Sequence, residues 1–164
     1  MTSLAREVAF KSPLTNLDAT ELLNLDYQYL NDLFGAYEHI GSTAEKKKLS
    51  KVLCDALLAS ARSEEEIFFP EIKKCLKEKG LVSAIIMEHS ILKYLVAEIE
   101  NLDADSVIYD IKIKVLGEHL KQLVREKQSK LFPKVIASGK VDLWRLGAEL
   151  SAFKAAIKRN SHSA

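Results

Sequence analysis

The chain has 164 residues, of which 48% are hydrophobic and 29% charged, and its 24 basic side chains nearly balance 23 acidic ones. This length and composition are typical of one soluble globular domain. The balanced charge argues against a nucleic-acid partner, and the longest mainly apolar stretch, Leu81 to Met87, is too short to span a membrane.

Scarce glycine and proline, together with apolar residues that recur at a helical period, predict an all-α protein. The predicted helices cover residues 19–40, the stretch from Ser42-Thr43 to 79, residues 82–100, the stretch from Asp103 or Asp105 to 131, and residues 142–159. Asp18 is the expected N-cap of the first helix, and Gly41 and Gly80 are the expected stops. Pro70 and Pro133 should kink or end the helices that contain them.

Four long amphipathic helices with short connections predict an up-down-up-down four-helix bundle within a single domain, residues 1–164. The bundle should occupy about residues 18–136, and the C-terminal helix, about 142–159, should pack outside it.

Two cysteines, Cys54 and Cys75, would lie about 30 Å apart on one helix and could not pair with each other. Unpaired core cysteines favour a reducing compartment. Residues 1–14 contain no apolar signal-peptide core. We therefore expect a cytoplasmic protein.

One pattern is written twice, as Ser60–Pro70 (SARSEEEIFFP) and as Leu123–Pro133 (LVREKQSKLFP). Near it, polar side chains interrupt the apolar stripes of the predicted helices. These positions are Tyr27, Ser60, Glu64, His89, His119 and Lys127. A single buried serine or histidine is usually a satisfied core residue, and buried Glu and Lys are rare unless paired. Here all four bundle helices direct polar groups to one level, which is where bundles build their sites.

These motifs resemble the hemerythrin-like, or HHE cation-binding, family across nearly all of the chain. The matching segments are Asp26-Tyr27, Glu64–Pro70, Glu88-His89-Ser90, Lys114–His119, Lys130–Lys134 and Leu146–Leu150. In that family a di-iron centre is held by a His on the first helix, His-x-x-x-Glu on the second, a His on the third, and His-x-x-x-Glu or Asp on the fourth.

Carried over residue by residue, the resemblance places the ligand positions at Tyr27, Ser60, Glu64, His89, Leu123 and Lys127. Only Glu64 and His89 retain a ligand of the family, so the metal site is degenerate. Leu123 has no donor atom, and Lys127 brings a positive charge to the place of a carboxylate. We expect the Lys127 ammonium to occupy the place of the metal and pair with Glu64, with hydrogen bonds from Tyr27 and Ser60.

The sequence therefore predicts a protein that is not an enzyme, binds no cofactor, and acts as an interaction or regulatory module for an unknown protein partner. The alternative is a remodelled mononuclear iron or zinc site made by Tyr27, Glu64, His89 and His119, for oxygen or nitric oxide sensing or iron handling. An acid–base enzyme using Glu64 and His89 is a third hypothesis, but no nucleophile or phosphate-binding loop supports it.

The oligomeric state stays open, and a homodimer is one alternative. Phe10, Trp144 and Phe153 could cover the bundle or form a dimer contact. We expect Trp144 to pack the last helix onto the bundle, because the lone tryptophan of a small domain usually belongs to its core.

Overall fold

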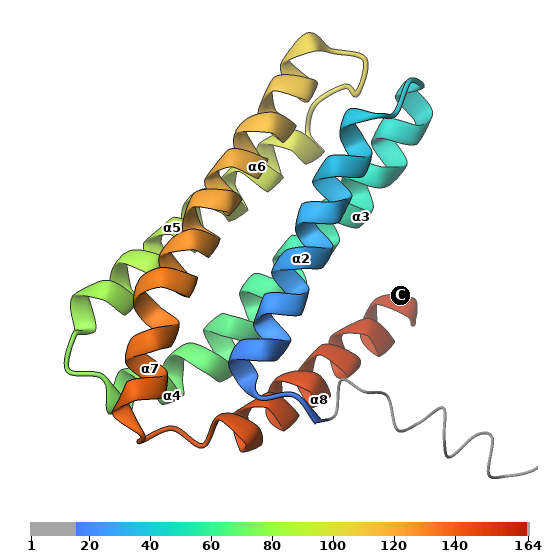
Figure 1. Cartoon of the computed structure of the whole chain (residues 1–164). Coiled ribbons are helices and arrows are strands. Elements are labelled where there is room, and N and C mark those ends of the chain that lie inside the picture. Colours follow the sequence, from blue (N-terminus) through green and yellow to red (C-terminus); the bar gives the residue numbers. More distant parts are fainter. Residues whose placement is uncertain (1–15, 164) are drawn as a thin grey trace, which may run out of the picture.

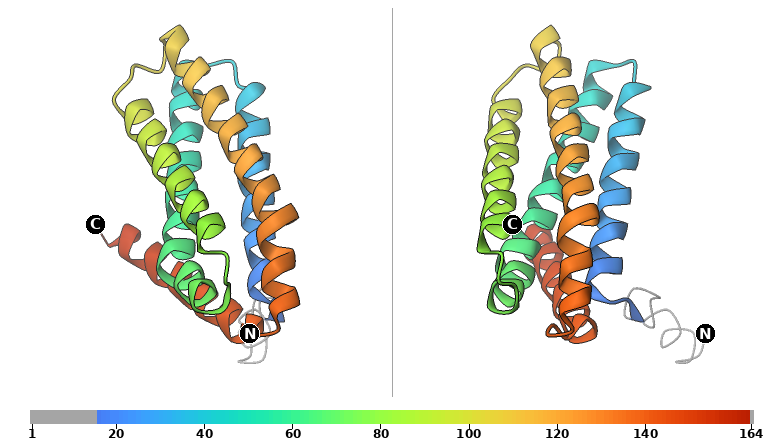
Figure 2. Two further views of the ribbon diagram at one scale, coloured as in Figure 1. Left: turned by 90° about the vertical axis from the view of Figure 1, so that its left-hand side faces the viewer. Right: turned by 60° about the vertical axis from the view of Figure 1, so that its left-hand side comes forward.

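The computed structural model describes residues 16–163, which are almost entirely helical and contain no β-strand. The elements are α2 (Ala19–Glu38), α3 (Thr43–Ser63), η2 (Glu64–Phe68), α4 (Phe69–Cys75), α5 (Lys79–Glu100), α6 (Val107–Glu126), η3 (Lys127–Leu131), α7 (Phe132–Ser138) and α8 (Leu143–His162), where η2 and η3 are π-helical turns. The long helices α2, α3, α5 and α6 lie alongside one another, and α8 lies across one end of them (Figures 1 and 2). The predicted all-α class is confirmed.

Short polar side chains begin most of the long helices. The Asp18 carboxylate accepts hydrogen bonds from the amides of Thr20 and Glu21, and the Glu21 side chain accepts one from the Asp18 amide in return. This capping box confirms the predicted start of α2. The expectation that Asp103 or Asp105 begins the fourth helix is wrong, because Ser106 is the N-cap and its hydroxyl accepts from the Ile108 amide.

The second predicted helix ends earlier than expected. Leu76 takes an extended conformation after Cys75, and the next helix already begins at Lys79. Gly80 is therefore the second residue of α5 and not a helix stop. The first helix likewise ends at Glu38, before Gly41.

Each proline of the repeated pattern follows a π-helical turn and leaves the helix continuous. The Phe69 amide bonds the Glu64 carbonyl, and the Phe132 amide bonds the Lys127 carbonyl, five residues earlier in each case. Pro70 and Pro133 then stand in the first turns of α4 and α7, where a missing N–H is tolerated. Helical residues therefore continue through each proline without a break, so neither proline ends its helix at that point.

The sequence predicts that one stripe of the fourth helix faces the core, and this stripe is wrong in its first half. The predicted stripe is Ile108, Ile111, Val115, His119, Leu123, Lys127 and Leu131. Ile108, Ile111 and Val115 are exposed on α6. Steps of four residues advance the stripe by about 40° each around a helix of 3.6 residues per turn. The predicted stripe therefore drifted off the core face. The buried positions are Tyr109, Ile113, Leu116, Leu120 and Leu123.

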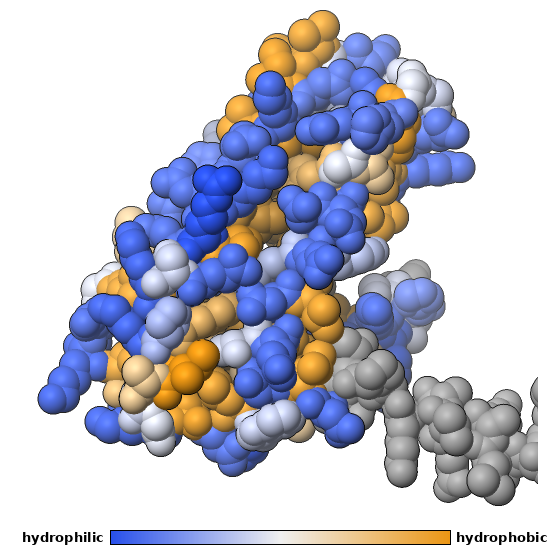
Figure 3. Space-filling model, in the orientation of Figure 1, coloured by the Kyte–Doolittle hydropathy of each residue, from blue (hydrophilic) through white to orange (hydrophobic). Residues whose placement is uncertain are grey.

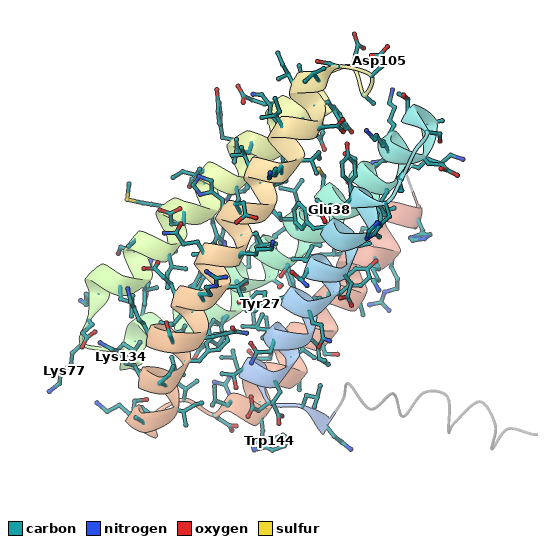
Figure 4. All side chains as sticks on the ribbon, turned by 45° about the horizontal axis from the view of Figure 1, so that its top comes forward. Tyr27, Glu38, Lys77, Asp105, Lys134 and Trp144 are labelled. Carbon is teal, nitrogen blue, oxygen red and sulfur yellow. The ribbon has the colours of Figure 1, made fainter. Side chains whose placement is uncertain are left out.

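Leu146 and Leu150 are fully buried and attach α8 to the ends of α2 and α3. Gly147 makes close contact possible, since a Cβ at this position would lie 2.5 Å from the Leu17 carbonyl oxygen. The expected role of Trp144 is wrong, because its side chain is 63% exposed and points away from the helices (Figure 4). Of the other two aromatics considered, Phe153 is half-buried on α8, with the Arg62 guanidinium 5.5 Å from its ring centroid. Phe10 lies outside the described residues.

α5 is the most apolar of the long helices. An 18-residue window in Lys79–Glu100 has a mean hydropathy of 1.4, so among the described residues this one helix is long and apolar enough to cross a membrane. This apolar window is longer than the stretch from Leu81 to Met87, which by itself is too short to span a membrane. A core helix passes the same test, and one face of α5 is buried while Met87, Ile91 and Tyr94 are exposed. On the face drawn in Figure 3, polar side chains are interspersed with apolar ones, which are visible where α6 begins and at the opposite end, near α4 and α7.

Candidate functional site

The most unusual residue of the core is Lys127, whose side chain is only 2% exposed. It stands at the first position of the π-helical turn η3, directed into the space between the four long helices. Its ammonium donates to both carboxylate oxygens of Glu64, with Nζ–Oε1 2.9 Å and Nζ–Oε2 2.7 Å. Glu64 is equally buried and occupies the first position of the other π-helical turn, η2. A buried ion pair between Lys127 and Glu64 therefore lies between the four long helices.

Two further helices complete the surroundings of the pair. From α2, the Tyr27 hydroxyl donates to Glu64 Oε1 at 2.9 Å. From α5, His89 Nε2 lies 2.9 Å from the Lys127 ammonium. Because an ammonium can only donate, Nε2 is the acceptor and the ring proton resides on Nδ1. Tyr27 lies between the helices in Figure 4.

A second ion pair connects the core to the surface. His89 Nδ1 lies 3.2 Å from Glu65 Oε1, and the Lys93 ammonium donates to both oxygens of Glu65 at 2.9 and 2.8 Å. The Lys93 side chain is 42% exposed. The chain of polar contacts therefore runs from Lys93 through Glu65 and His89 to Lys127 and Glu64.

Aromatic rings enclose this pair in a nearly two-fold arrangement. Tyr27 of the first half stacks on Phe132 of the second, at 6.3 Å between ring centroids. In the reverse sense, His89 of the second half meets Phe69 of the first edge-on, at 5.3 Å. The Lys127 ammonium lies 5.0 Å from the Tyr27 ring centroid and 5.9 Å from that of Phe69. The rings exclude water from the charges and add cation–π attraction.

Burial and the paired charges set the protonation of each group. Burial raises the pKa of the Glu64 carboxyl and lowers that of the Lys127 ammonium, while each charge opposes the shift of the other. Burial, followed by the nearby charge of Lys127, lowers the pKa of His89 to about 2. Burial and the carboxylate of Glu64 raise the pKa of Tyr27 well above its usual value. His89 is therefore a neutral acceptor and Tyr27 a neutral phenol donor near pH 7.

The structure brings together most of the residues that the sequence singled out. Hydrogen bonds connect Tyr27 to Glu64, Glu64 to Lys127 and Lys127 to His89, and Ser60 and Leu123 line the same cavity. Ser60 does not play its expected part, because its buried hydroxyl oxygen has no hydrogen-bond partner. His119 is also misplaced by the prediction. It lies on the surface of α6, 40% exposed, with Nδ1 3.8 Å from Glu88 Oε2, because the stripe that includes it winds away from the core.

Sequence reasoning missed Glu65 and Lys93. Glu65 lies beside Glu64 in a run of three glutamates, and nothing in the helical period distinguishes it from a solvated side chain. The available signal was the spacing of Lys93, one helical turn after His89 on α5. Glu65 completes the hydrogen-bond requirement of His89 and so fixes its tautomer.

The residues present do not fit the di-iron ligand set that the family resemblance implies. The Lys127 ammonium is bonded to both oxygens of Glu64, so a cation could coordinate them at the usual 2.0–2.2 Å only after displacing it. The cavity at this level is about 10 Å³, close to the lower limit for one water molecule. Ser60, which stands where the family has a ligand, has a hydroxyl with no partner. Within residues 16–163, no three His, Cys, Asp or Glu side chains form a cluster that could hold a metal ion.

No protein-family model, curated protein or solved structure matches this chain.

Proposed function

We propose that this protein is a hemerythrin-like, up-down-up-down four-helix bundle in which a lysine–glutamate pair has replaced the metal centre. In this proposal it acts without catalysis, as an interaction or regulatory module. The observation that carries the proposal is the position of the Lys127 ammonium, bonded to Glu64 and His89, the two positions that retain a ligand of the family.

The replacement has a clear physical logic. A bundle built around a metal has a buried carboxylate and imidazole whose lone pairs need a cation or a donor. An ammonium supplies one positive charge and three N–H donors, and here it contacts both of these groups. A buried charge is tolerated when it is paired and hydrogen-bonded. In this proposal the Lys127 ammonium satisfies Glu64 and His89 in the core, as a metal ion would in a metal-binding bundle.

A surface role is supported by the side chains that the bundle leaves outside. Met87, Ile91 and Tyr94 recur on the outer face of α5 at helical spacing, and each is at least 41% exposed. Ile111 and Val115 are exposed on the neighbouring helix α6. Groups of exposed apolar side chains are typical of surfaces that bind other molecules.

The alternative, a remodelled mononuclear iron or zinc site, rests on the convergence of Tyr27, Glu64 and His89. It requires the Lys127 side chain to leave the core and the Tyr27 phenol to lose its proton against a raised pKa. His119, the fourth ligand in this alternative, lies on the surface. The lysine–glutamate pair therefore accounts for the geometry with fewer changes.

Metal content distinguishes the two proposals. Tag-free protein expressed with iron and zinc available should contain under about a tenth of an equivalent of transition metal and show no visible absorption band. One equivalent with a tyrosinate-to-iron band would establish the remodelled site. Two equivalents would contradict the assignment of the lost ligands.

A gain-of-function variant tests the family alignment separately. The quadruple variant Tyr27→His, Ser60→His, Leu123→His and Lys127→Glu restores the ligand set position by position. It should bind iron, while a matched triple variant that keeps Lys127 should bind it much more weakly, because the ammonium still occupies Glu64. A folded quadruple variant without affinity for iron would refute the alignment.

A further inference from the structure

A groove lies between α3 and α5 at the end of the molecule where α5 passes into α6. Its volume is about 510 Å³, and it is lined by the first turns of α3, the last turn of α5, Leu102 of the following loop, and Tyr109 of α6. Figure 2 shows these segments at the end opposite to α8. The volume falls within the range of small-molecule sites, roughly 300–1,000 Å³. The groove is distinct from the buried pair around Lys127, with which it shares no lining residue.

The floor of the groove is apolar, and the Tyr109 hydroxyl within it is already hydrogen-bonded to another residue of the lining. Cys54, Ile99 and Tyr109 belong to the hydrophobic core and lie at the base, and Leu102 packs beside them. The Tyr109 hydroxyl donates to the Ser50 hydroxyl at 2.5 Å, so it is already satisfied. The thiol of Cys54 stays protonated, because burial raises its pKa to about 11. The floor therefore favours an aliphatic group over a polar one.

The rim of the groove is positively charged. Lys47, Lys48 and Lys51 line it from α3, against the single carboxylate of Glu100 from α5. Lys51 is bonded to Asp55 on the outer face of α3. Among the described residues, Lys47 and Lys48 form no ion pair, which leaves two ammonium groups available at the mouth of an apolar groove.

We propose that this groove binds a small amphiphile, with its anionic head group on Lys47 and Lys48 and its aliphatic chain on the floor made by Ile99, Leu102 and Tyr109. Charge complementarity selects the anionic head group, and the apolar floor selects the chain. The α3 part of the lining extends only from Ala44 to Cys54, about 15 Å, which suits a small molecule better than a docked helix. This site lies beyond the proposed function and does not depend on whether the core holds a metal.

Calorimetric titration of the full chain with decanoate, below its micelle concentration, tests the proposal. Decyl phosphate distinguishes a general requirement for an anion from a specific one for carboxylate, and decanol and decyltrimethylammonium test the charge. Decanoate or decyl phosphate should bind one to one, with affinity that falls as salt is added. Decanol should bind at least about tenfold more weakly than decanoate, and decyltrimethylammonium should not bind.

Variants locate the site. Lys47→Glu combined with Lys48→Glu should reduce the affinity for the anion by at least about tenfold. The matched control, Lys114→Glu combined with Lys121→Glu, changes the same charge on α6 away from this groove and should leave the affinity within about twofold of wild type. Circular dichroism establishes that each variant is folded.

Three results would overturn the proposal. The first is that folded wild-type protein fails to bind either anion up to about 1 mM. The second is that both double variants bind equally well. The third is that the amide chemical-shift changes caused by decanoate map to residues outside 44–54 and 99–109.

Discussion

Replacing Lys127 with methionine should leave Glu64 as a carboxylate without a cation in the core. Methionine preserves most of the aliphatic volume of lysine, so the substitution removes the charge and three donors without opening a large cavity. Both oxygens of Glu64 lose their bonds to the ammonium, and only the Tyr27 hydroxyl remains as a donor. Breaking a buried ion pair by removing one partner costs about 3–5 kcal/mol.

This cost can be measured from urea-unfolding curves, monitored by circular dichroism, for four proteins: wild type, Lys127→Met, Glu64→Gln and the double variant. We expect Lys127→Met to lower the free energy of unfolding by about 3–5 kcal/mol, and the double variant to recover much of that loss because no unpaired charge remains. Single variants within about 0.5 kcal/mol of wild type would refute the reasoning, as would exact additivity of the two changes.

The pH dependence of Lys127→Met provides a second readout. Without the ammonium, burial alone raises the pKa of Glu64 above its value in the unfolded chain. A carboxyl with a raised pKa in the folded state stabilises the fold at low pH, and this stability is lost as the pH rises. The deficit of Lys127→Met relative to wild type should therefore shrink as the pH falls from 8 through the raised pKa of Glu64 towards the ordinary carboxyl pKa of about 4.3. A deficit that is constant or grows over this range would contradict the assignment of the lost charge.

Other positions give independent predictions. Because His89 has a pKa of about 2 in the folded protein, against 6.5 ordinarily, wild type should lose stability as the pH falls below about 6.5, by at most about 1.4 kcal/mol per unit. His89→Gln, which keeps an acceptor and does not titrate, should flatten this part of a urea-unfolding pH profile; an unchanged slope would contradict it. Tyr27→Phe should lower the free energy of unfolding by about 1.5–3 kcal/mol by removing a donor to a carboxylate, whereas Ser60→Ala should be neutral or stabilising, since its hydroxyl is unbonded. In thermal melts, Gly147→Ala should lower Tm, because its Cβ would meet the Leu17 carbonyl, while Gly35→Ala, in open space on α2, should stabilise by about 0.5–1 kcal/mol; equal effects of the two would refute the close-contact argument.

The helices could be predicted from the sequence because they depend on local rules, and the central ion pair could be predicted because the family resemblance places Glu64 and Lys127 at ligand positions of one site. The apolar period locates the long helices, and a buried lysine facing a buried glutamate leaves pairing as the favourable arrangement. Asp18 was identified as a cap because its side chain acts on its own neighbouring amides. The helices and this cap need no knowledge of which helix faces which, whereas the ion pair does.

The parts that failed depend on geometry that accumulates along a helix or between helices. His119 fell outside the core because a small angular error per step places a residue on another face after two or three turns. Trp144 is exposed because the packing face of α8 was already filled by Leu146 and Leu150 around the close contact at Gly147. The π-helical turns have no simple sequence signal, although the recurrence of an aromatic and a proline marks where each one ends.

The two members of the central pair occupy the same position of a repeated pattern, 63 residues apart. The halves of the chain are thus alike in helix order and aromatic contacts but opposite in the sign of their one central charge. Two first halves brought together would oppose two carboxylates in a dry core, and two second halves would oppose two ammonium groups, and like charges at such distances are strongly unfavourable. The sign of this charge should therefore favour the pairing of a first half with a second half, whether in one molecule or by exchange between two. The opposite charges of Glu64 and Lys127 thus attract the two different halves of the chain to each other, whereas two identical halves would repel each other.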